Sequence, residues 1–190
     1  MTSALRADSI DVRKAGMDDI APLLRLINDY AAKGIMLPRT EFEMSENIRD
    51  FSLICSGPDL VACGALHFYS PIMGEVRSLA VDPKWKSNGA GRRMVDALLA
   101  EARQFSLDAV FAFTYVADFF RKMGFEEVER GELPLKAWKD CLRCPKFQSC
   151  DEIAVLRVLR PEHYQPWGEP DGEPGVLVPV PVLPTPARRG

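Results

Sequence analysis

The sequence lacks three features that define large classes of protein. Its 24 Lys and Arg against 27 Asp and Glu give a net charge of -3, so it has no positive excess for binding nucleic acid or an anionic membrane surface. No run approaches the roughly 20 apolar residues that a membrane-spanning helix needs. Residues 1–14 hold no apolar stretch of the kind found in secretory signals. We therefore expect a cytoplasmic protein whose partners include neither nucleic acid nor membrane.

Proline and glycine are unevenly distributed along the chain. The last 30 residues hold eight of the 15 prolines and four of the 13 glycines, a density that removes backbone donors and leaves no periodic apolar face. We expect 161–190 to be a disordered tail, with a docking peptide for a proline-binding groove as the alternative. The preceding 1–160 are long enough for one domain with a sizeable core.

Apolar periodicity predicts an α+β (mixed α/β) domain. Strands are expected at 10–14, 51–55, 60–69, 74–81, 109–114 and 152–159. Helices are expected at 17–31 and 40–50, from residue 90 onward, and at 117–123. Because the early strands follow one another directly and the later ones alternate with helices, we expect a mixed central sheet flanked by helices.

The segment 75–95 carries the strongest functional signal. A predicted strand ends in Val-Asp-Pro (81–83) and leads through Lys-Ser-Asn-Gly-Ala-Gly (86–91) into a helix. Loop amides and the helix dipole converge at such a turn, which suits it to bind an anion. A Walker loop would need Gly-Lys followed by Ser or Thr, and a Rossmann fingerprint would need a glycine at Met94. Neither pattern is present, and an ordinary strand–helix turn is the structural alternative.

The order strand, Val-Asp-Pro, Lys-x-x-Gly-x-Gly, helix, strand and a helix ending in Gly-Phe resembles the GNAT acyl-CoA N-acyltransferases over about 10–160. The resemblance implies the GNAT fold and acetyl-CoA as co-substrate, with the pantetheine arm along the strand and the pyrophosphate in the loop. It assigns cofactor binding to Leu79, Ala80, Val81, Lys86, Ser87, Asn88, Gly89, Ala90, Gly91 and Arg92. The family usually has Arg or Gln where this chain has Lys86, so the role of that lysine is open.

Several phrases spread over the chain resemble the short bacterial N-acetylglutamate synthases. They are KGIMLPRT (33–40), CGALHFY (63–69), GEVRSLAVDP (74–83), TYVADFFRKMGF (114–125) and LPLKAWKDCLRCPKF (133–147). The resemblance implies transfer of an acetyl group to the α-amine of L-glutamate, the first step of arginine biosynthesis. These short synthases are stand-alone GNAT domains, and the resemblance to them predicts little inhibition by arginine. The oligomeric state is open, and a homodimer is one alternative.

Glutamate has two carboxylates and one amine, so its pocket needs well-placed cations. Arg39 and Arg77 are suitable bidentate donors, with Lys136 as a weaker third candidate. The alternative for each arginine is a solvated surface position or a structural ion pair. Strand alternation predicts that Arg77 points to the same side as Glu75 and Leu79.

Glu75 matches the position at which many family members carry the general base, with a salt bridge to Arg77 as the alternative. The amide of Leu79 is a candidate oxyanion donor. Many GNAT enzymes also use a tyrosine as general acid, four residues before the glycine of Gly-Phe. That position is Phe120, which cannot donate a proton, and Tyr115 and Ser78 are the other candidate donors.

The cysteines form only half of a zinc pattern. Cys141, Cys144 and Cys150 are spaced C-x2-C-x5-C, whereas a structural zinc site needs four ligands. His67 or Cys63 would have to complete it, and no spacing brings them near. We therefore expect reduced thiols and no metal.

Two other functions compete with glutamate acetylation. The first is a GNAT enzyme for another amine, although cationic acceptors favour acidic pockets and disagree with the two arginines. The second is a non-catalytic acetyl-CoA-binding module, which the missing tyrosine at Phe120 favours.

Overall fold

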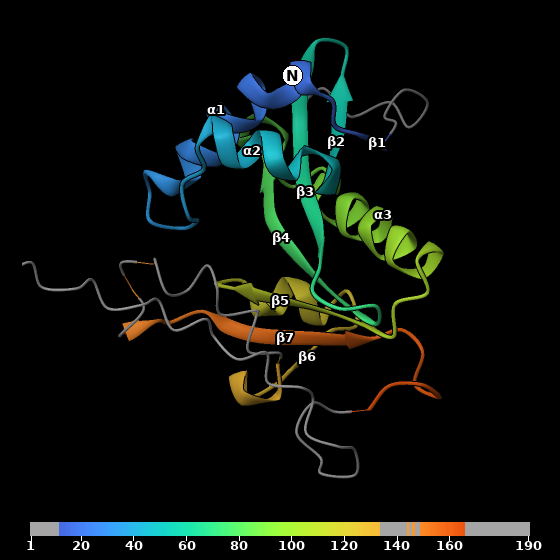
Figure 1. Ribbon diagram of the computed structural model, residues 1–190. Coiled ribbons are helices and arrows are strands. Elements are labelled where there is room, and N and C mark those ends of the chain that lie inside the picture. The colour runs from blue at the N-terminus through green and yellow to red at the C-terminus, as the bar shows by residue number, and fades with distance from the viewer. Residues whose placement is uncertain (1–11, 134–143, 145, 147–148, 166–190) are drawn as a thin grey trace, which may run out of the picture.

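The computed structural model describes residues 12–133, 144, 146 and 149–165, in which helices pack on both sides of one twisted sheet (Figure 1). The strands are β1 (Val12–Lys14), β2 (Phe51–Ser56), β3 (Asp59–Phe68), β4 (Met73–Val81), β5 (Ala109–Thr114), β6 (Glu126–Glu127) and β7 (Ile153–Val158). The α-helices are α1 (Ile20–Ala31), α2 (Glu41–Asn47), α3 (Ala90–Gln104) and α4 (Ala117–Arg121). Short 3-10 turns are η2 (Met17–Asp19), η3 (Ile48–Asp50), η4 (Pro83–Trp85) and η5 (Arg130–Glu132).

The strands and helices expected from periodicity are confirmed to within a few residues. The exception is β6, which has two residues and therefore no period to detect. Most of the expected tail, 166–190, lies outside the described residues, while Tyr164 packs partly buried against the sheet. Among the described residues, none of the helices combines the length and the apolar character of a membrane span.

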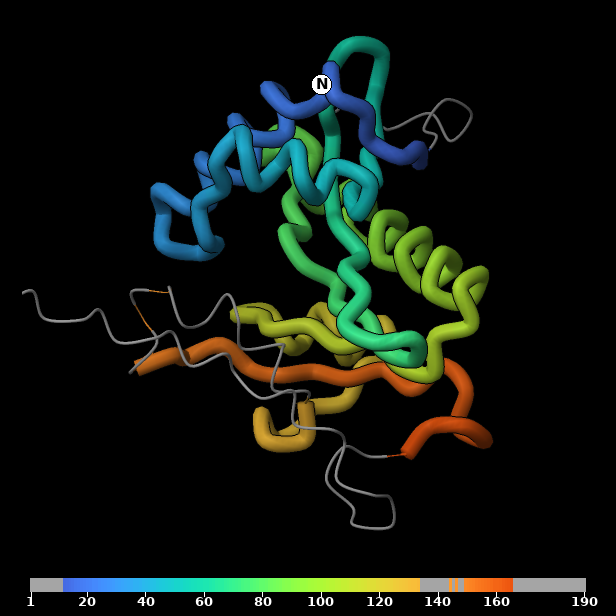
Figure 2. Tube along the Cα trace, in the orientation of Figure 1, coloured from blue at the N-terminus to red at the C-terminus, as the bar shows by residue number. Residues whose placement is uncertain are grey.

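The sheet has the strand order β1-β2-β3-β4-β5-β7-β6, and its one parallel pair is β4 with β5. The chain trace in Figure 2 shows β7 returning from far along the sequence to lie beside β5. Strands β4 and β5 pair only where Met73–Glu75 face Ala109–Phe111. Beyond this short seam the two strands diverge, and residues 76–81 of β4 keep pairing with β3 alone.

Each face of the sheet is covered by a different part of the chain. The predicted stripe of α3 is buried against one face, where Met94 and Leu98 pack with Val76 of β4. On the other face Leu23 of α1 packs in a second cluster with Ala80 of β4. Both faces of β4 are therefore buried, which holds this strand rigidly beside the seam.

A β-bulge interrupts the pairing of β3 with β4. The register shifts between Cys63 and Ala65, so that Ser78 and Leu79 both oppose Gly64. Ser78 adopts a left-handed conformation with φ of 52°, which carries the extra residue of the bulge.

The bulge makes one prediction from strand alternation wrong. Leu79 and Val81 pack on the α3 face of the sheet, whereas Arg77 contacts Asn47 of α2 on the opposite face. Arg77 and Leu79 therefore point to opposite sides, because the inserted residue reverses the alternation between them. Glu75 lies before the bulge, and it keeps the predicted side in common with Arg77.

Candidate active site

The loop between β4 and α3 has the backbone geometry of an anion site. The side chain of Asp82 accepts from the amide of Lys84 and starts η4. Ser87 and Gly89 then adopt positive φ values of 67° and 78°, and α3 begins at Ala90. Left-handed residues just before a helix turn successive amides toward one point, where the helix dipole adds positive potential. A Cβ added at Gly89 would meet nothing within 4 Å, so this position requires glycine for its φ.

Positive side chains surround this loop at the surface. The Lys86 ammonium lies 5.2 Å from the ring centroid of Tyr30, and the Lys33 ammonium lies 5.4 Å from it. The Tyr30 hydroxyl donates to the carbonyl of Val81 at 2.7 Å and so ties α1 to the end of β4. Arg92 is exposed on the first turn of α3, 3.9 Å from Asp96. Lys86 therefore contributes charge without the fork geometry of an arginine.

The diverging edge of β4 provides the second part of a cofactor site. Leu79, Ala80 and Val81 lie on the part of β4 whose far edge, away from β3, has no partner in β5 among the described residues. An edge of this kind offers backbone donors and acceptors to an extended ligand. The edge leads directly into the anion loop, so the residues present fit a ligand with an extended arm and a phosphate group, as acetyl-CoA has.

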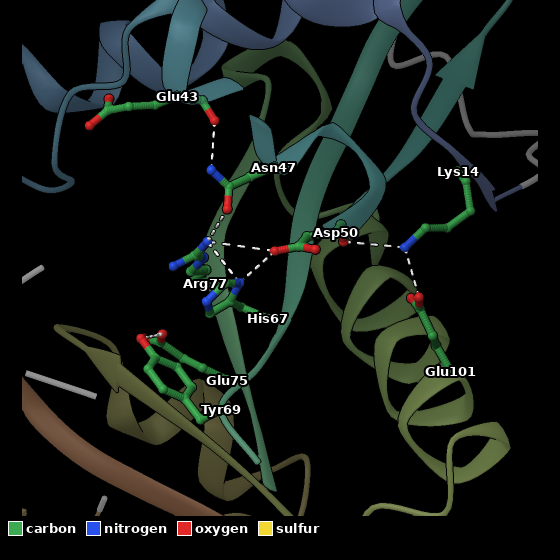
Figure 3. A network of polar contacts seen from close by, with 9 residues as sticks. All are labelled: Lys14, Glu43, Asn47, Asp50, His67, Tyr69, Glu75, Arg77 and Glu101. Carbon is green, nitrogen blue, oxygen red and sulfur yellow. Dashed lines mark hydrogen bonds and ion pairs between the residues drawn. The ribbon is translucent and has the colours of Figure 1, made fainter. Parts of the chain in front are cut away.

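Glu75 lies where the seam ends. It is the last β4 residue paired with β5, opposite Phe111, and it is 8% exposed. The Tyr69 hydroxyl donates to its Oε2 at 3.0 Å (Figure 3). A buried carboxylate at the point where β4 and β5 separate is suitably placed to accept a proton from a bound amine.

Arg77 lies in a polar network two residues further along β4 (Figure 3). Its Nη2 donates to Asn47 Oδ1 at 3.2 Å and lies 3.0 Å from His67 Nδ1 and 3.6 Å from Asp50 Oδ2. His67 Nδ1 is 2.6 Å from the same Asp50 oxygen, so this ring nitrogen lies within hydrogen-bond distance of both the carboxylate and the guanidinium. The Arg77 side chain is 8% exposed, and Asp50 balances part of its charge.

The other predicted substrate residue, Arg39, lies in the loop between α1 and α2. Its backbone amide donates to Asn28 Oδ1 at 2.9 Å, and its carbonyl accepts from Asn28 Nδ2 at 3.0 Å. Thr40 then caps α2 by accepting from the amide of Glu43. Arg39 is thus held between α1 and the start of α2, with its side chain half-buried. Lys136 lies outside the described residues.

The candidate proton donors differ in their surroundings. Phe120 is buried in the core, edge-on to Phe119 and Phe125, so the structure gives it a packing role. Tyr115 follows β5, and its hydroxyl accepts from Lys146 Nζ at 3.3 Å. Partial burial raises the pKa of Tyr115. Ser78 lies at the bulge.

The cysteines form no group of three metal-ligating side chains within the described residues, and Cys141 lies outside them. Cys150 Sγ is 3.0 Å from Arg130 Nη2. Cys63 is fully buried on β3, near the carbonyl of Ser78. These contacts account for two of the cysteines as packing and hydrogen-bonding groups.

Sequence reasoning missed the residues that surround Glu75 and Arg77. Asp50, His67 and Tyr69 all lie on this face of the sheet. The signal was available in part, because alternation along β3 places His67 and Tyr69 on one side. The register that places His67 opposite Glu75 and Tyr69 diagonally from it depends on the turn between β3 and β4, and the sequence pattern leaves that register undetermined.

Comparison with known proteins identifies the family. The model of the acetyltransferase (GNAT) family matches residues 23–125. The chain belongs to this family. It is therefore an acyltransferase with the GNAT fold and with acetyl-CoA as co-substrate, which confirms those predictions.

Curated relatives of this GNAT chain include several N-acetyltransferases. An uncharacterized N-acetyltransferase of Chlorobaculum tepidum is 37% identical over 148 residues, which cover 78% of this chain and 96% of the relative. An amino-acid acetyltransferase of Mycobacterium tuberculosis is 38% identical over 122 residues, which cover 62% of this chain and 69% of the relative.

A solved structure of N-acetylglutamate synthase from Neisseria gonorrhoeae, complexed with coenzyme A and N-acetyl-glutamate, superposes on this chain with a TM-score of 0.74. The two are 26% identical, and the match covers 82% of this chain but only 36% of the gonococcal chain. A Mycobacterium tuberculosis protein in complex with CoA has a TM-score of 0.66 and 30% identity, with coverage of 78% and 99%.

Proposed function

We propose that this GNAT enzyme transfers the acetyl group of acetyl-CoA to the α-amine of L-glutamate, by direct attack in a ternary complex. The reaction would supply the first intermediate of arginine biosynthesis. Acetyl-CoA contributes the acetyl group, activated as a thioester. The residues of the chain bind the two substrates, orient them and accept the proton of the attacking amine.

The observation that carries the proposal is the likeness to amino-acid acetyltransferases over most of the chain. The relative from Mycobacterium tuberculosis bears that name, and the gonococcal synthase holds N-acetyl-glutamate in its solved structure. These likenesses support an amino acid as acceptor, and L-glutamate is the acceptor that we propose.

The position of Glu75 supports its role as general base. It lies where β4 and β5 begin to diverge, at the point where a pantetheine arm bound along β4 would end. It shares a face of the sheet with Arg77, two residues away. A substrate whose carboxylate approached Arg77 would therefore bring its amine near a carboxylate that can take its proton.

The geometry supports Arg77 and Arg39 as carboxylate-binding residues to different degrees. Arg77 is held rigidly by Asn47, which pre-organises its guanidinium. Asp50 lies 3.6 Å from it and weakens its attraction for an anion. Arg39 lies on a fixed loop between two helices, and its side chain is half-buried. We propose that both arginines bind the substrate.

The direct test is release of CoA from acetyl-CoA with L-glutamate, compared with D-glutamate, glutamine and spermidine. Saturable release with L-glutamate alone supports the proposal. Release with spermidine keeps the fold and the cofactor site but overturns the assignment of the pocket. Binding of acetyl-CoA without turnover of any of these amines points to the non-catalytic module.

Alanine variants test the two arginines separately. Arg39→Ala and Arg77→Ala are each expected to raise the KM for L-glutamate about 10- to 100-fold, the value of a lost hydrogen bond to a charged group. Steady-state kinetics with varied glutamate and saturating acetyl-CoA measures this change. Arg13→Ala is the matched control, because Arg13 pairs with Asp19 on the exposed surface. An unchanged glutamate KM in a folded Arg77→Ala protein would leave Arg77 with a structural role only.

One observation favours a different acceptor. Because Asp50 balances part of the charge of Arg77, the face beside Glu75 is less positive than the sequence suggests. An amine with a single carboxylate, or with none, would then be tolerated. The comparison acceptors in the CoA-release assay distinguish this case.

A further inference from the structure

Tyr69 reaches Glu75 through the register of the hairpin formed by β3 and β4. His67 of β3 lies directly opposite Glu75, and Ala65 lies opposite Arg77. Tyr69 follows His67 by two residues, on the same side of the chain, which makes it the diagonal neighbour of Glu75. This is the geometry in which a long aromatic side chain spans to the next strand.

Packing fixes the Tyr69 ring in this position. Its backbone amide donates to the carbonyl of Met73 at 3.0 Å across the turn. The ring lies edge-on to His67, with centroids 5.1 Å apart, and tilted against Phe111 of β5 at 5.5 Å. The hydroxyl then donates to Glu75 Oε2 at 3.0 Å. Neighbours on two strands therefore direct the hydroxyl at the carboxylate.

We propose that Tyr69 is a positioning residue for this acyltransferase, and that its hydroxyl holds Glu75 ionised and oriented to take the proton of the attacking amine. The inference rests on the role proposed above for Glu75. In the proton step an N–H bond of the substrate ammonium breaks and an O–H bond forms on Glu75. The neutral amine that results attacks the acetyl carbonyl, a C–N bond forms, and the C–S bond breaks to release the CoA thiolate. The second proton that the nitrogen loses as it becomes an amide goes to this thiolate, which leaves as the CoA thiol.

The surroundings of Glu75 explain why such a donor matters. Burial favours the neutral form of a carboxyl, and a hydrogen bond donated to the carboxylate favours the ionised form. Besides Tyr69, the charged and titratable groups that the described residues place on this face include His67 of β3, Arg77 of β4 and Asp50 of η3. Strand β5 presents Phe111 beside Glu75. Tyr69 therefore adds a donor on the side of Glu75 where β5 contributes an apolar ring.

The test is the pH profile of kcat for Tyr69→Phe, which keeps the ring and removes the hydroxyl. We expect the acid limb to move to higher pH by about one unit, the effect of losing one hydrogen bond to a charged group. At pH values above the acid limb, kcat of Tyr69→Phe stays within about threefold of the value for the unchanged enzyme. The dissociation constant of acetyl-CoA is unchanged, since Tyr69 lies away from the loop at 86–92. Tyr164→Phe is the matched control, and its limb stays in place.

A second variant protects the test against a folding defect. Replacing Tyr69 with 3-fluorotyrosine keeps the ring and the hydroxyl but makes the hydroxyl a stronger donor, so the acid limb moves to lower pH. Opposite shifts in the two variants establish the role. An acid limb that stays in place in the fluorinated enzyme, or in a folded Tyr69→Phe protein, overturns it.

The acceptor need not be glutamate for this experiment to work. The profile is measured with whichever amine the enzyme acetylates, and the amine's own ionisation is the same for every variant. Failure of L-glutamate as acceptor therefore rejects the proposed substrate. An unmoved limb with an active acceptor rejects the role of Tyr69.

Discussion

At the scale of single residues, the buried charge of Arg77 sets a requirement that the neighbouring elements meet. Asp50 supplies the opposite charge from η3, and Asn47 supplies a neutral acceptor from the end of α2. The Asp50 carboxylate also lies 2.6 Å from His67 Nδ1. A buried guanidinium without such partners would be strongly destabilising.

Asp50→Asn removes the charge that balances Arg77 while preserving the size of the side chain. We expect the free energy of unfolding to fall by about 2 kcal/mol, since a partly exposed partner of a buried charge is lost. Urea denaturation measures the change. Asp118→Asn is the control, because its carboxylate forms an exposed pair with Arg121 and should cost less than about 0.5 kcal/mol. Equal effects in the two variants would contradict the account.

The buried thiol of Cys63 is expected to lower the free energy of unfolding at alkaline pH. Full burial raises the pKa of its thiol from an ordinary 9.0 to about 12. The unfolded chain loses this proton above pH 9 and the folded chain keeps it, so stability falls as the pH rises from 9 toward 12. We expect the difference in unfolding free energy between the unchanged protein and Cys63→Ala to shrink by about 1.4 kcal/mol per pH unit between pH 9.5 and 11. If this difference in unfolding free energy did not change with pH, the thiol would ionise as readily in the folded protein as in the unfolded chain.

At the scale of elements, the bulge in β4 decides which side chains reach the site. It directs Leu79 into the α3 face while Arg77 stays on the opposite face. Gly64, opposite the bulge, packs under α3 without a side chain. A Cβ there would lie 3.0 Å from side-chain atoms of both Leu98 and Met94.

Gly64→Ala is therefore expected to lower the free energy of unfolding by about 1–3 kcal/mol through overpacking. Chemical denaturation gives the value. Gly131→Ala is the matched control, because a Cβ at Gly131 would meet nothing within 4 Å. Should both variants be equally stable, α3 would have room to shift away from the sheet.

The sequence predicted the regular elements better than the contacts between distant residues. Periodicity over the runs of α1, α3 and the longer strands predicted these elements, because each buries one regular face. The glycine loop at 86–91 predicted a backbone suited to an anion, and the left-handed Ser87 and Gly89 have that geometry, while the binding of acetyl-CoA there stays a prediction. The bulge at Ser78 and the partners of Arg77 escaped prediction, since both depend on which residues of separate segments face each other.

At the scale of the whole molecule, the sheet consists of two parts joined at a short seam. Strands β1–β4 form one part, strands β5–β7 form the other, and three residues of each strand meet between β4 and β5. The proposed cofactor edge and the proposed base both lie at this divergence.

Binding at the seam should stabilise the whole chain. At a concentration 100 times its dissociation constant, a ligand that binds only the folded state adds about 2.7 kcal/mol. For acetyl-CoA we expect a rise in melting temperature of about 5–10 °C, measured by differential scanning calorimetry. Gly89→Val forces a branched side chain into a left-handed position and should reduce the rise. A full rise in that variant would place the anion elsewhere.

The strand order also has a consequence for synthesis on the ribosome. Strands β1–β4 are neighbours in chain order, so their pairing with one another is complete once Val81 has emerged. Strand β5 is different, because its antiparallel partner β7 begins only at Ile153. Until that segment leaves the exit tunnel, the short seam with β4 is the backbone pairing that the described residues give to β5. The nascent chain therefore exposes one edge of β5 from the emergence of Thr114 until the emergence of β7, which is the interval in which a chaperone would have most to protect.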